Sequence, residues 1–326
     1  MTAPHVRVVC VTFSPGAALP VFLDSLAAAT SHPYEVVLAD NGSTDGSVEA
    51  AELRGEVRLL RTGANLGYGR AANLGASGAT APWLVVANPD VEWERDSLDL
   101  LLHAASRWPS AGCLGPAIRT SDGQLYPSAR AFPSLGRGTG HALLGPFWPG
   151  NPWTRSYRAE AGRPEEGTTG WLSGSCLLLR REAFEAVGGF DPSYFMYCED
   201  MDLCRRLGED GWQDVYVPGA VVTHTGGHAT QRSAGPMLAE HHRALYRYLS
   251  RQYARPVQAP VRGVLALGLL ARYLLARRVR SIGEGAAPTR PATLLQTETL
   301  SRTETPLQTE TLLQTEPDPM TRGGRP

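Results

Sequence analysis

The sequence predicts an α/β fold built around a mostly parallel central sheet that is flanked by helices. Short runs of β-branched and apolar residues alternate with segments of helical composition over residues 6–88. Most of the apolar runs are followed by Gly, Pro, Asn or Asp, which are turn formers. Strands that alternate with helices favour parallel pairing through right-handed crossovers. In such sheets ligands bind outside the carboxyl ends of the strands, which is where the polar clusters of this sequence fall.

The predicted elements follow one another closely in the first part of the chain. Strands are expected at 6–13, 35–40, 57–62 and 83–88, and helices at 17–29, at 46–53 and in the second half of 65–75. From about 120 to 169 Pro, Gly, Trp and Arg dominate, so we expect a long loop region with little regular structure. Further strands are expected at 170–181 and 212–218.

The composition is that of a globular protein with one large or two modest domains. The 326 residues are 42% hydrophobic and 19% charged, and the net charge of -1 gives no reason to expect a nucleic-acid partner. The N-terminus has no charged segment followed by a long apolar stretch, so we expect no signal peptide. Scattered cysteines without a CxxC pair favour reduced thiols and a cytoplasmic location. They are Cys10, Cys113, Cys176, Cys198 and Cys204.

The C-terminal part of the chain has two helical stretches and a tail of low complexity. The stretches lie at 237–253 and 261–280, in a region with nine arginines and no acid beyond Glu240. The second is apolar for only ~14 residues and contains Arg272, so we expect it to lie on a membrane surface rather than span. A helix packed on the rest of the chain is the alternative. The tail from about 283 repeats LQTE, and we expect it to be disordered.

A polar cluster follows the second predicted strand. Asp40 and Asn41 open the sequence DNGSTDGS. A carboxylate at this position could accept a hydrogen bond from a pyrimidine N3–H or a ribose hydroxyl. The alternative is an Asx turn followed by a helix cap, because Asp, Asn and Ser all favour turns.

A second cluster follows the fourth predicted strand. Asn88-Pro89-Asp90 is a D/N-x-D element, which could supply oxygen ligands for Mg²⁺ or Mn²⁺ beside a diphosphate. A turn that ends the strand is the alternative. His224 follows the predicted strand at 212–218 and could complete the metal ligands, although a single His is also commonly structural.

Three acids crowd the start of a predicted helix. Glu199, Asp200 and Asp202 precede an apolar helical run. Like charges this close raise the pKa of at least one carboxyl group, which suits a general base that deprotonates a hydroxyl. The alternative is helix capping, in which acids at the N-terminus favour the helix dipole and the pKa falls. The sequence leaves these two interpretations open.

Taken in order, these segments resemble family 2 glycosyltransferases of the GT-A fold. The similar segments are VRVVCVTF, LADNGSTDGS, NLGYGRAANLG, LVVANPD, GGFDPSYFMYCEDMDLCRRL and HTGGH, within about residues 6–230. The resemblance is greatest to rhamnosyltransferase-like members of cell-wall and O-antigen synthesis. It implies a Rossmann-like nucleotide-binding half at 1–118 and an acceptor half at 119–232. C-terminal helices at 233–282 and a tail at 283–326 would follow.

The resemblance also implies roles for individual residues. Asp200 matches the acid of the ED pair that serves as catalytic base, with Glu199 beside it. Asp90 and His224 match metal ligands. The residues expected to bind the nucleotide-sugar donor are Thr12, Asp40, Asn41, Asn65, Gly67, Asn73 and Asn88. The position of the 120–169 loops, and not the resemblance, makes an acceptor or lid surface of Arg130, Trp148, Trp153 and Tyr157, because aromatic faces suit sugar rings. The alternative is that these residues pack the loop.

Two positions depart from the family pattern. The first strand ends in Phe13-Ser14 where Tyr-Asn is usual. The metal motif begins with Asn88 where many relatives have Asp, so the site would hold its cation weakly or depend more on His224.

The activity implied by the resemblance is inverting sugar transfer that depends on Mg²⁺ or Mn²⁺. The donor would be a nucleotide-diphosphate sugar, first of all dTDP-rhamnose, and the acceptor a glycan or a polyprenyl-linked glycan. The protein would act in the cytoplasm or as a peripheral protein on the inner face of the plasma membrane.

Two other functions compete with this interpretation. Gly67 to Ala72 fits the GxGxxA fingerprint of an NAD(P)-dependent oxidoreductase, with Asp90 18 residues beyond. That fingerprint belongs in the first strand-to-helix turn, which here is Ser14-Pro15-Gly16. The second competitor is a non-catalytic relative that only binds carbohydrate or membrane, and the intact set of acids argues against it.

Overall fold

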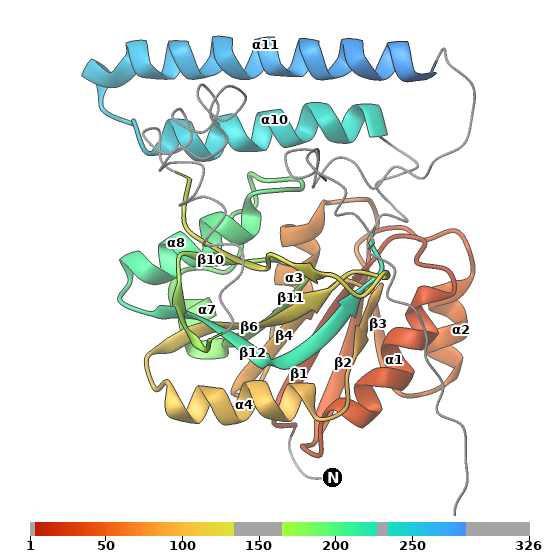
Figure 1. Ribbon diagram of the computed structural model, residues 1–326. Helices are drawn as coiled ribbons and strands as arrows, with labels where there is room; N and C mark the ends of the chain where they lie inside the picture. The colour runs from red at the N-terminus through yellow and green to blue at the C-terminus, as the bar shows by residue number, and fades with distance from the viewer. Residues whose placement is uncertain (1–3, 134–164, 227–233, 285–326) are drawn as a thin grey trace, which may run out of the picture. The chain divides into compact units, whose positions relative to one another are not determined.

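The computed structural model describes residues 4–133, 165–226 and 234–284, and a central sheet organises them (Figure 1). Ten of the described strands form this sheet, in the order β3-β2-β1-β4-β11-β6-β12-β5, with β7 beside β6 and β9 beside β12. β8 and β10 form a separate pair. The strands are β1 (Val6–Thr12), β2 (Tyr34–Asp40), β3 (Val57–Arg61), β4 (Trp83–Ala87), β5 (Val91–Trp93), β6 (Ala111–Arg119), β7 (Leu125–Tyr126), β8 (Ala129–Arg130), β9 (Gly167–Thr169), β10 (Trp171–Leu172), β11 (Cys176–Arg180) and β12 (Gln213–His224).

The first half of the sheet is parallel, as the alternation of strands and helices predicts. β1 pairs in parallel with β2 and β4, and β2 pairs in parallel with β3. All residues of β1 are buried, which is typical of a parallel strand covered on both faces. The antiparallel strand β11 then separates β4 from a second parallel pair, β6 and β12. The predicted α/β fold with helices around a central sheet is confirmed.

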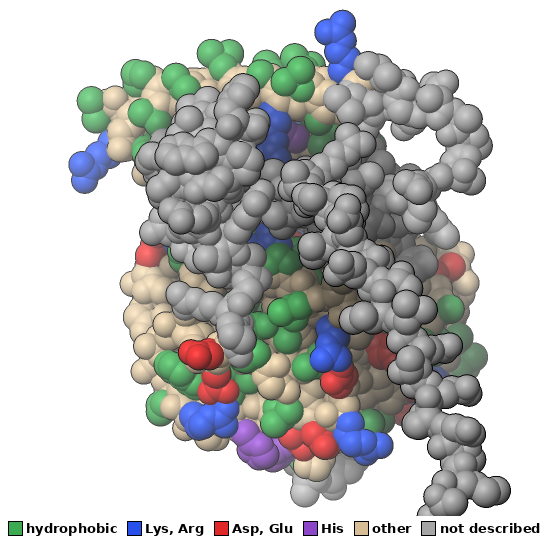
Figure 2. Space-filling model, viewed as in Figure 1, with side chains coloured by type: hydrophobic (Ala, Val, Ile, Leu, Met, Phe, Trp, Pro, Cys, Tyr) green, Lys and Arg blue, Asp and Glu red, His purple; other side chains and the backbone are tan. Residues whose placement is uncertain are grey.

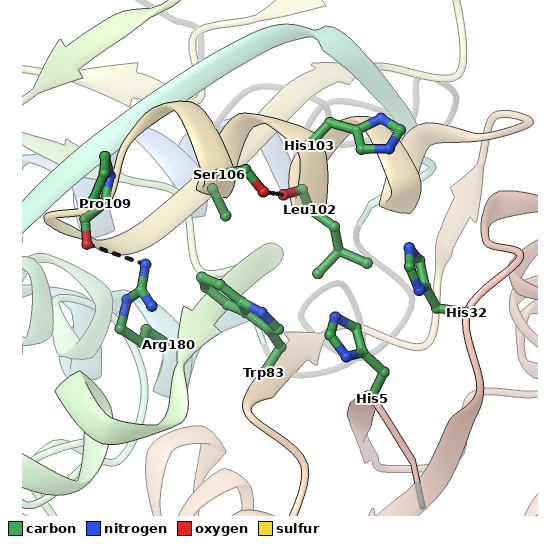
Figure 3. A pocket seen from close by; sticks show the side chains of 9 residues that line it. His5, His32, Trp83, Leu102, His103, Ser106, Pro109 and Arg180 are labelled. Carbon is green, nitrogen blue, oxygen red and sulfur yellow. Dashed lines mark hydrogen bonds between the residues drawn. The ribbon is translucent and has the colours of Figure 1, made fainter. Parts of the chain in front are cut away.

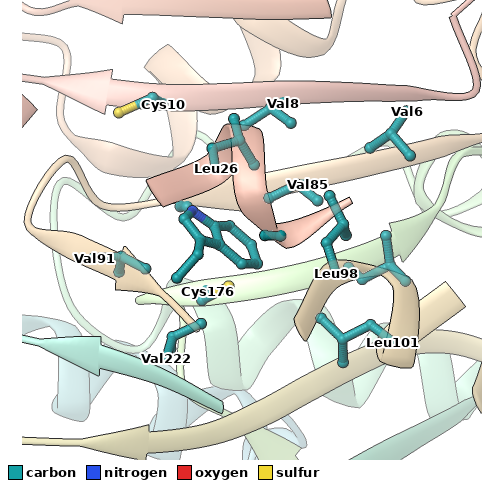
Figure 4. Close-up of a cluster of buried hydrophobic side chains, with 14 of the residues drawn as sticks. Val6, Val8, Cys10, Leu26, Val85, Val91, Leu98, Leu101, Cys176 and Val222 are labelled. Atoms are coloured by element: carbon teal, nitrogen blue, oxygen red, sulfur yellow. The ribbon is translucent and has the colours of Figure 1, made fainter. Parts of the chain in front are cut away.

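Helices cover both faces of the sheet. Alternate residues of β1 divide between two cores. Val8 and Cys10 pack with α1 and α4 (Figure 4), whereas Val9 and Val11 pack with α3, α7 and α8. This period of two fixes which face of the strand each helix layer covers. The helices are α1 (Ala18–Ala29), α2 (Ser47–Leu53), α3 (Tyr68–Ala76), α4 (Ser97–Arg107), α7 (Arg181–Ala186), α8 (Glu199–Glu209), α10 (Ala234–Arg251), the 3₁₀ turn η2 (Pro256–Gln258) and α11 (Ala259–Glu284).

Strand β6 was not predicted from the sequence, because its two glycines and its proline are residues more typical of turns than of strands. A Cβ at Gly115 would lie 2.8 Å from Leu172 Cδ2, and one at Gly112 would lie 2.8 Å from Trp212 Cβ. Glycine is therefore required where neighbouring elements approach the strand closely. The short strand β5, which the prediction also lacks, pairs with the end of β12.

Several predicted boundaries were wrong. The strand expected at 170–181 is two strands, β10 and β11, separated by Ser173-Gly174-Ser175. The strand expected at 212–218 extends to His224, through a register shift between Val217 and Val221 against β6. The loop region expected at 120–169 contains the short strands β7, β8 and β9 in its described part. In each case pairing with a neighbouring strand, which the local pattern does not encode, decides the boundary.

The predicted C-terminal helices are α10 and α11, which lie side by side (Figure 1). They belong to the same unit of the chain as the sheet. By length and composition Pro256–Arg278 is long and apolar enough to cross a membrane, so the expectation that this stretch is too short was wrong. The domain boundaries at 118 and 232 stay predictions. The tail beyond residue 284 lies outside the described residues.

Candidate active site

The carboxyl ends of the parallel strands bring the first predicted residues together at one edge of the sheet. Thr12 at the end of β1 is in register with Asp40 at the end of β2. Cys10, two residues earlier on β1, is in register with Ala87, next to Asn88. The strand pairing thus places the clusters that begin at Asp40 and Asn88 at the same edge.

The side chain of Asp40 is buried and fixed by hydrogen bonds. Its carboxylate accepts hydrogen bonds from Thr12 Oγ1 at 2.9 Å, the Ser43 N–H at 3.2 Å and the Gly42 N–H at 3.3 Å. The Ser43 hydroxyl also donates to it. These are the contacts of the Asx turn considered as the alternative, and they hold the carboxylate in one position at the edge.

Asn41 connects this turn to the loop before α3. Its Nδ2 donates to the Gly67 carbonyl at 3.1 Å, and its Oδ1 accepts from the Leu66 N–H at 3.2 Å. Asn65 Oδ1 accepts from the Gly67 N–H at 3.1 Å. The predicted donor residues Asn41, Asn65 and Gly67 therefore form one hydrogen-bonded unit beside Asp40.

Gly67 and Asn73 join this half of the sheet to the acidic segment. Gly67 has a φ of +86°, and a Cβ there would lie 2.1 Å from the Phe195 carbonyl oxygen, so only glycine fits. Asn73 Nδ2 donates to the Phe190 carbonyl at 2.8 Å, and its Oδ1 accepts from the Phe190 N–H at 2.9 Å. The amide of Asn73 therefore holds the loop that leads to α8, and its donor-binding role stays a prediction.

The side chains of Asn88, Asp90 and His224 converge. His224 Nε2 lies 3.1 Å from Asp90 Oδ1 and 3.2 Å from Asn88 Nδ2. The pairing of β12 with β5 causes this, because His224 is in register with Val91, the neighbour of Asp90. A carboxylate oxygen and an imidazole nitrogen, with an amide beside them, fit a divalent cation that accepts oxygen and nitrogen ligands.

Glu199 and Asp200 lie in the first turn of α8. Two residues with positive φ, Tyr197 (69°) and Cys198 (63°), turn the chain into this helix. Asp200 Oδ2 accepts from the Gly174 N–H at 2.9 Å, and its Oδ1 accepts from the Met201 N–H at 2.8 Å. Glu199 is buried, and its Oε2 has no hydrogen-bond partner among the described residues.

Burial raises the pKa of both carboxyl groups of this pair. Desolvation, with the Asp200 charge as a second cause, raises the pKa of Glu199 to about 8. Desolvation also raises the pKa of Asp200. The two backbone N–H donors and the charge of Arg130 act in the opposite direction and lower this pKa, but desolvation is the larger effect. At neutral pH Glu199 therefore holds a proton. Asp200 remains a stronger base than a helix-capping acid would be.

The loop Ser173-Gly174-Ser175 connects the two clusters. The Ser175 carbonyl accepts from the Asn88 N–H at 2.9 Å, and the Gly174 N–H donates to Asp200. The Tyr68 hydroxyl donates to the Gly174 carbonyl at 2.6 Å. Sequence reasoning assigned no role to this loop or to Tyr68. The available signal was the sequence Ser173-Gly174-Ser175 itself, which is typical of a turn.

The remaining predicted residues lie apart from these contacts or outside the described residues. Asp202 pairs with Arg206 at 2.7 Å and with Arg251 at 3.0 Å, so the third acid holds α8 and α10 together. Arg130 lies over the rings of Tyr126 and Trp171 and acts electrostatically on Asp200. The other predicted acceptor residues, Trp148, Trp153 and Tyr157, lie outside the described residues.

A pocket of about 440 Å³ lies at the opposite edge of the sheet (Figure 3). His5 and Trp83, which line it, stand at the amino ends of β1 and β4, and Arg180 ends the antiparallel β11. It contains none of the predicted site residues. The chemistry indicated by the acids therefore belongs to the other edge.

The family profiles agree with the geometry. The profile of "Glycosyl transferase family 2" matches residues 8–188, and that of "Glycosyl transferase family group 2" matches residues 162–276. The chain belongs to glycosyl transferase family 2. It is therefore a nucleotide-sugar-dependent glycosyltransferase of the inverting type, and the oxidoreductase alternative was wrong.

Similar proteins point the same way. The chain is 56% identical over 277 residues to an "N-acetylglucosaminyl-diphospho-decaprenol L-rhamnosyltransferase" of Mycobacterium tuberculosis, covering 81% of this chain and 90% of that protein. It is 40% identical over 82 residues to "Rhamnosyltransferase WbbL" of Escherichia coli, covering 25% of this chain and 31% of that protein.

A solved structure shares the fold. The "Crystal structure of GalNAc-T7 with UDP, GalNAc and Mn2+" is similar with a TM-score of 0.51 and 19% sequence identity, covering 69% of this chain and 43% of that chain. At this identity the likeness concerns the fold, and it confirms the predicted GT-A type.

Proposed function

We propose that this protein transfers L-rhamnose from dTDP-rhamnose to the sugar of an N-acetylglucosaminyl-diphospho-polyprenol, on the cytoplasmic side of the membrane. The sugar and acceptor follow from the relative that is 56% identical over most of both chains. The location is supported by the five cysteines, which are free and buried. The observation that carries the catalytic part is the loop 173–175, which contacts both Asn88 and Asp200.

The nucleotide is proposed to bind at the end of β2. The Asp40 carboxylate is held at the edge by Thr12 and Ser43, and Asn41 fixes the following loop against Gly67. Such a fixed carboxylate can accept a hydrogen bond from the thymine N3–H or a ribose hydroxyl without losing conformational entropy on binding.

The donor diphosphate is proposed to lie beside Asn88, Asp90 and His224. These residues would hold Mg²⁺ or Mn²⁺, and the cation, when bound, would neutralise charge on the departing diphosphate. Asp90 and His224 are only partly buried, so their side chains are open to a ligand from solvent. Asp90 and His224 would therefore serve as ligands although residue 88 is Asn and not Asp.

Asp200 is proposed to accept the proton of the acceptor hydroxyl. The hydroxyl oxygen forms a bond to the anomeric carbon while the bond from that carbon to the diphosphate oxygen breaks, and the nucleoside diphosphate leaves. Because the attack comes from the face opposite the leaving group, one displacement inverts the configuration. The raised pKa of Asp200 favours its role as base, since a carboxylate with an ordinary pKa holds a proton less readily.

The proposal is tested with purified protein, a panel of nucleotide sugars and a short-chain N-acetylglucosaminyl-diphospho-polyprenol. Product is expected with dTDP-rhamnose, with at least tenfold less from each other donor. Treatment with EDTA should abolish product, and Mg²⁺ or Mn²⁺ should restore it. Preference for another sugar would contradict the donor assignment, and full activity after EDTA would contradict the cation assignment.

A further inference from the structure

The outward side of α11 is a surface that the sugar-transfer chemistry does not use. One side of this helix is half-buried at positions 262, 265, 269, 273 and 276. These positions share a helix face at spacings of three and four residues. Tyr273 on this face packs against His242 of α10, and the centroids of the two rings lie 5.7 Å apart. Packing against α10 therefore explains why this face is half-buried, whereas the opposite face is exposed.

The exposed side of this helix segment carries a row of large apolar residues. Single exposed apolar side chains are ordinary, but a continuous row on one helix marks an interaction surface. Figure 2 shows hydrophobic side chains along this helix, with basic side chains toward its ends. The exposed fractions are Val257 82%, Val264 72%, Leu267 69%, Leu270 52%, Leu274 52% and Leu275 66%.

The charges around this row have one sign. Arg272 and Arg277 are exposed, and at 100° per residue they lie on opposite flanks of the row. Between residues 241 and 278 the sequence contains no Asp or Glu. An apolar row flanked by arginines is complementary to a bilayer whose headgroups are negative, because the guanidinium groups can reach the lipid phosphates.

We propose that the row from Val257 in η2 to Leu275 in α11, called here the outward face of α11, lies in the interface of a bilayer that contains anionic phospholipid. The helix lies along the surface and does not cross it. Arg262 donates to the Tyr253 and Arg255 carbonyls and holds the first turns of α11 to the preceding chain. A spanning orientation would separate α11 from α10 and expose Tyr273 and His242.

Contacts between α10 and α8 connect α11 to the helix that contains Asp200. Arg251 of α10 pairs with Asp202 at 3.0 Å, and the Tyr248 hydroxyl accepts from Arg205 Nε at 2.9 Å. Both partners lie on α8, whose first turn contains Asp200. If the acceptor is lipid-linked, which rests on the proposed function, membrane-bound α11 would hold α8 at a fixed depth near the acceptor headgroup.

The test is sedimentation of the full chain with vesicles of phosphatidylcholine alone and of phosphatidylcholine with phosphatidylglycerol. The wild type is expected to bind the anionic vesicles at least tenfold more tightly. The double variant Leu267→Glu, Leu274→Glu should lose about tenfold or more of this binding. Leu53→Glu is the matched control, because Leu53 is an apolar residue that is 89% exposed on α2, and its binding should equal that of the wild type.

Three results would overturn the proposal. They are no binding by the wild type, equal binding by the double variant, and wild-type protein that resists extraction by alkaline carbonate as a spanning helix does. A dimer that the double variant dissociates, without vesicle binding by either protein, would show that a second copy covers this face. Circular dichroism checks that the variants fold.

Activity on two acceptors separates this inference from the proposed function. The double variant should transfer to a water-soluble short-chain acceptor at the wild-type rate and lose most of its transfer to acceptor in vesicles. If the wild type binds vesicles but transfers to neither acceptor, the proposed acceptor is wrong and the membrane inference stands.

Discussion

The two acidic clusters of the site differ in how fully their carboxyl groups are hydrogen-bonded. Asp40, on the donor side, is surrounded by hydroxyl and N–H donors from Thr12, Gly42 and Ser43. Of the pair in the first turn of α8, Glu199 is buried and its Oε2 has no partner among the described residues, whereas Asp200 accepts hydrogen bonds from the N–H groups of Gly174 and Met201. Donor hydrogen bonds stabilise a charge that binds, whereas desolvation leaves a carboxyl group that readily takes a proton.

On the proposed function, this difference would separate donor binding at Asp40 from proton transfer at Asp200. A carboxylate that is already hydrogen-bonded serves as a fixed acceptor for a ligand. Desolvation raises the pKa of Glu199 and of Asp200, and a raised pKa favours a base. Substitutions on the donor side should therefore act mainly on KM, and substitutions on the acceptor side should act mainly on kcat.

The largest effect is expected for Asp200→Asn. The amide cannot take the acceptor proton, so kcat should fall by about 10²–10⁴-fold. Binding of the nucleotide sugar, measured by calorimetry, should change by less than about threefold. A matching loss of donor affinity would mean that residue 200 belongs to the binding side.

A smaller loss is expected for Asp90→Ala and His224→Ala. Each removes one of two side chains that approach to 3.1 Å, so kcat/KM should fall by roughly 10–100-fold and more Mn²⁺ should be needed to reach half of the maximal rate. The titration of rate with Mn²⁺ measures this. An unchanged Mn²⁺ requirement in both variants would remove these residues from the cation site.

Asp40→Asn should affect binding rather than rate. The amide keeps the size of the carboxylate but loses its charge, so KM for the donor should rise by about tenfold while kcat stays within about threefold. Steady-state kinetics at saturating acceptor measures both constants. A fall in kcat without a change in KM would show that Asp40 acts in the chemical step and not in donor binding.

The smallest effect on activity is expected for Glu199→Gln. Since Glu199 is protonated below pH 8, the neutral amide should leave the rate at pH 7 within about threefold of the wild type. The rates should diverge only above about pH 8, where Glu199 of the wild type ionises. A large loss at pH 7 would show that Glu199 acts as a charged group.

The Glu199→Gln variant should also differ from the wild type in how its free energy of unfolding depends on pH. The folded protein raises the Glu199 pKa from 4.5 to about 8, so its contribution is fully present below pH 4.5 and is lost as the pH rises to 8. The free energy of unfolding of the wild type should fall in this window by at most about 1.4 kcal/mol per pH unit from this group. Urea denaturation of Glu199→Gln should show a correspondingly flatter dependence.

Local sequence pattern predicted the parallel half of the fold well and the other half less well. β1, β2, β3 and β4 are short runs rich in apolar residues, and turn residues mark their ends. β6 contains two glycines and a proline, and β12 extends through a register shift. Those features result from contacts with Leu172, Trp212 and β5, which are distant in sequence and so cannot be recovered from a local pattern.

The predicted site residues were found largely from motifs, but their connections were not. The family pattern points to Asp40, Asp90, Asp200 and His224, and the strand pairing brings Asp90 and His224 together. The protonation of Glu199 required burial, which the sequence does not report. Asn73 and Asp202 show the opposite case, in which a polar residue in a motif makes structural contacts.

The most direct test is the crystal structure of the Asp200→Asn protein with Mn²⁺, dTDP-rhamnose and a short-chain acceptor. We expect the diphosphate and the cation to lie beside Asp90 and His224. We also expect an acceptor hydroxyl about 3 Å from the side chain at position 200. A donor bound away from the edge that carries Asp40 and Asp90, or an acceptor hydroxyl directed at another base, would contradict the proposed function.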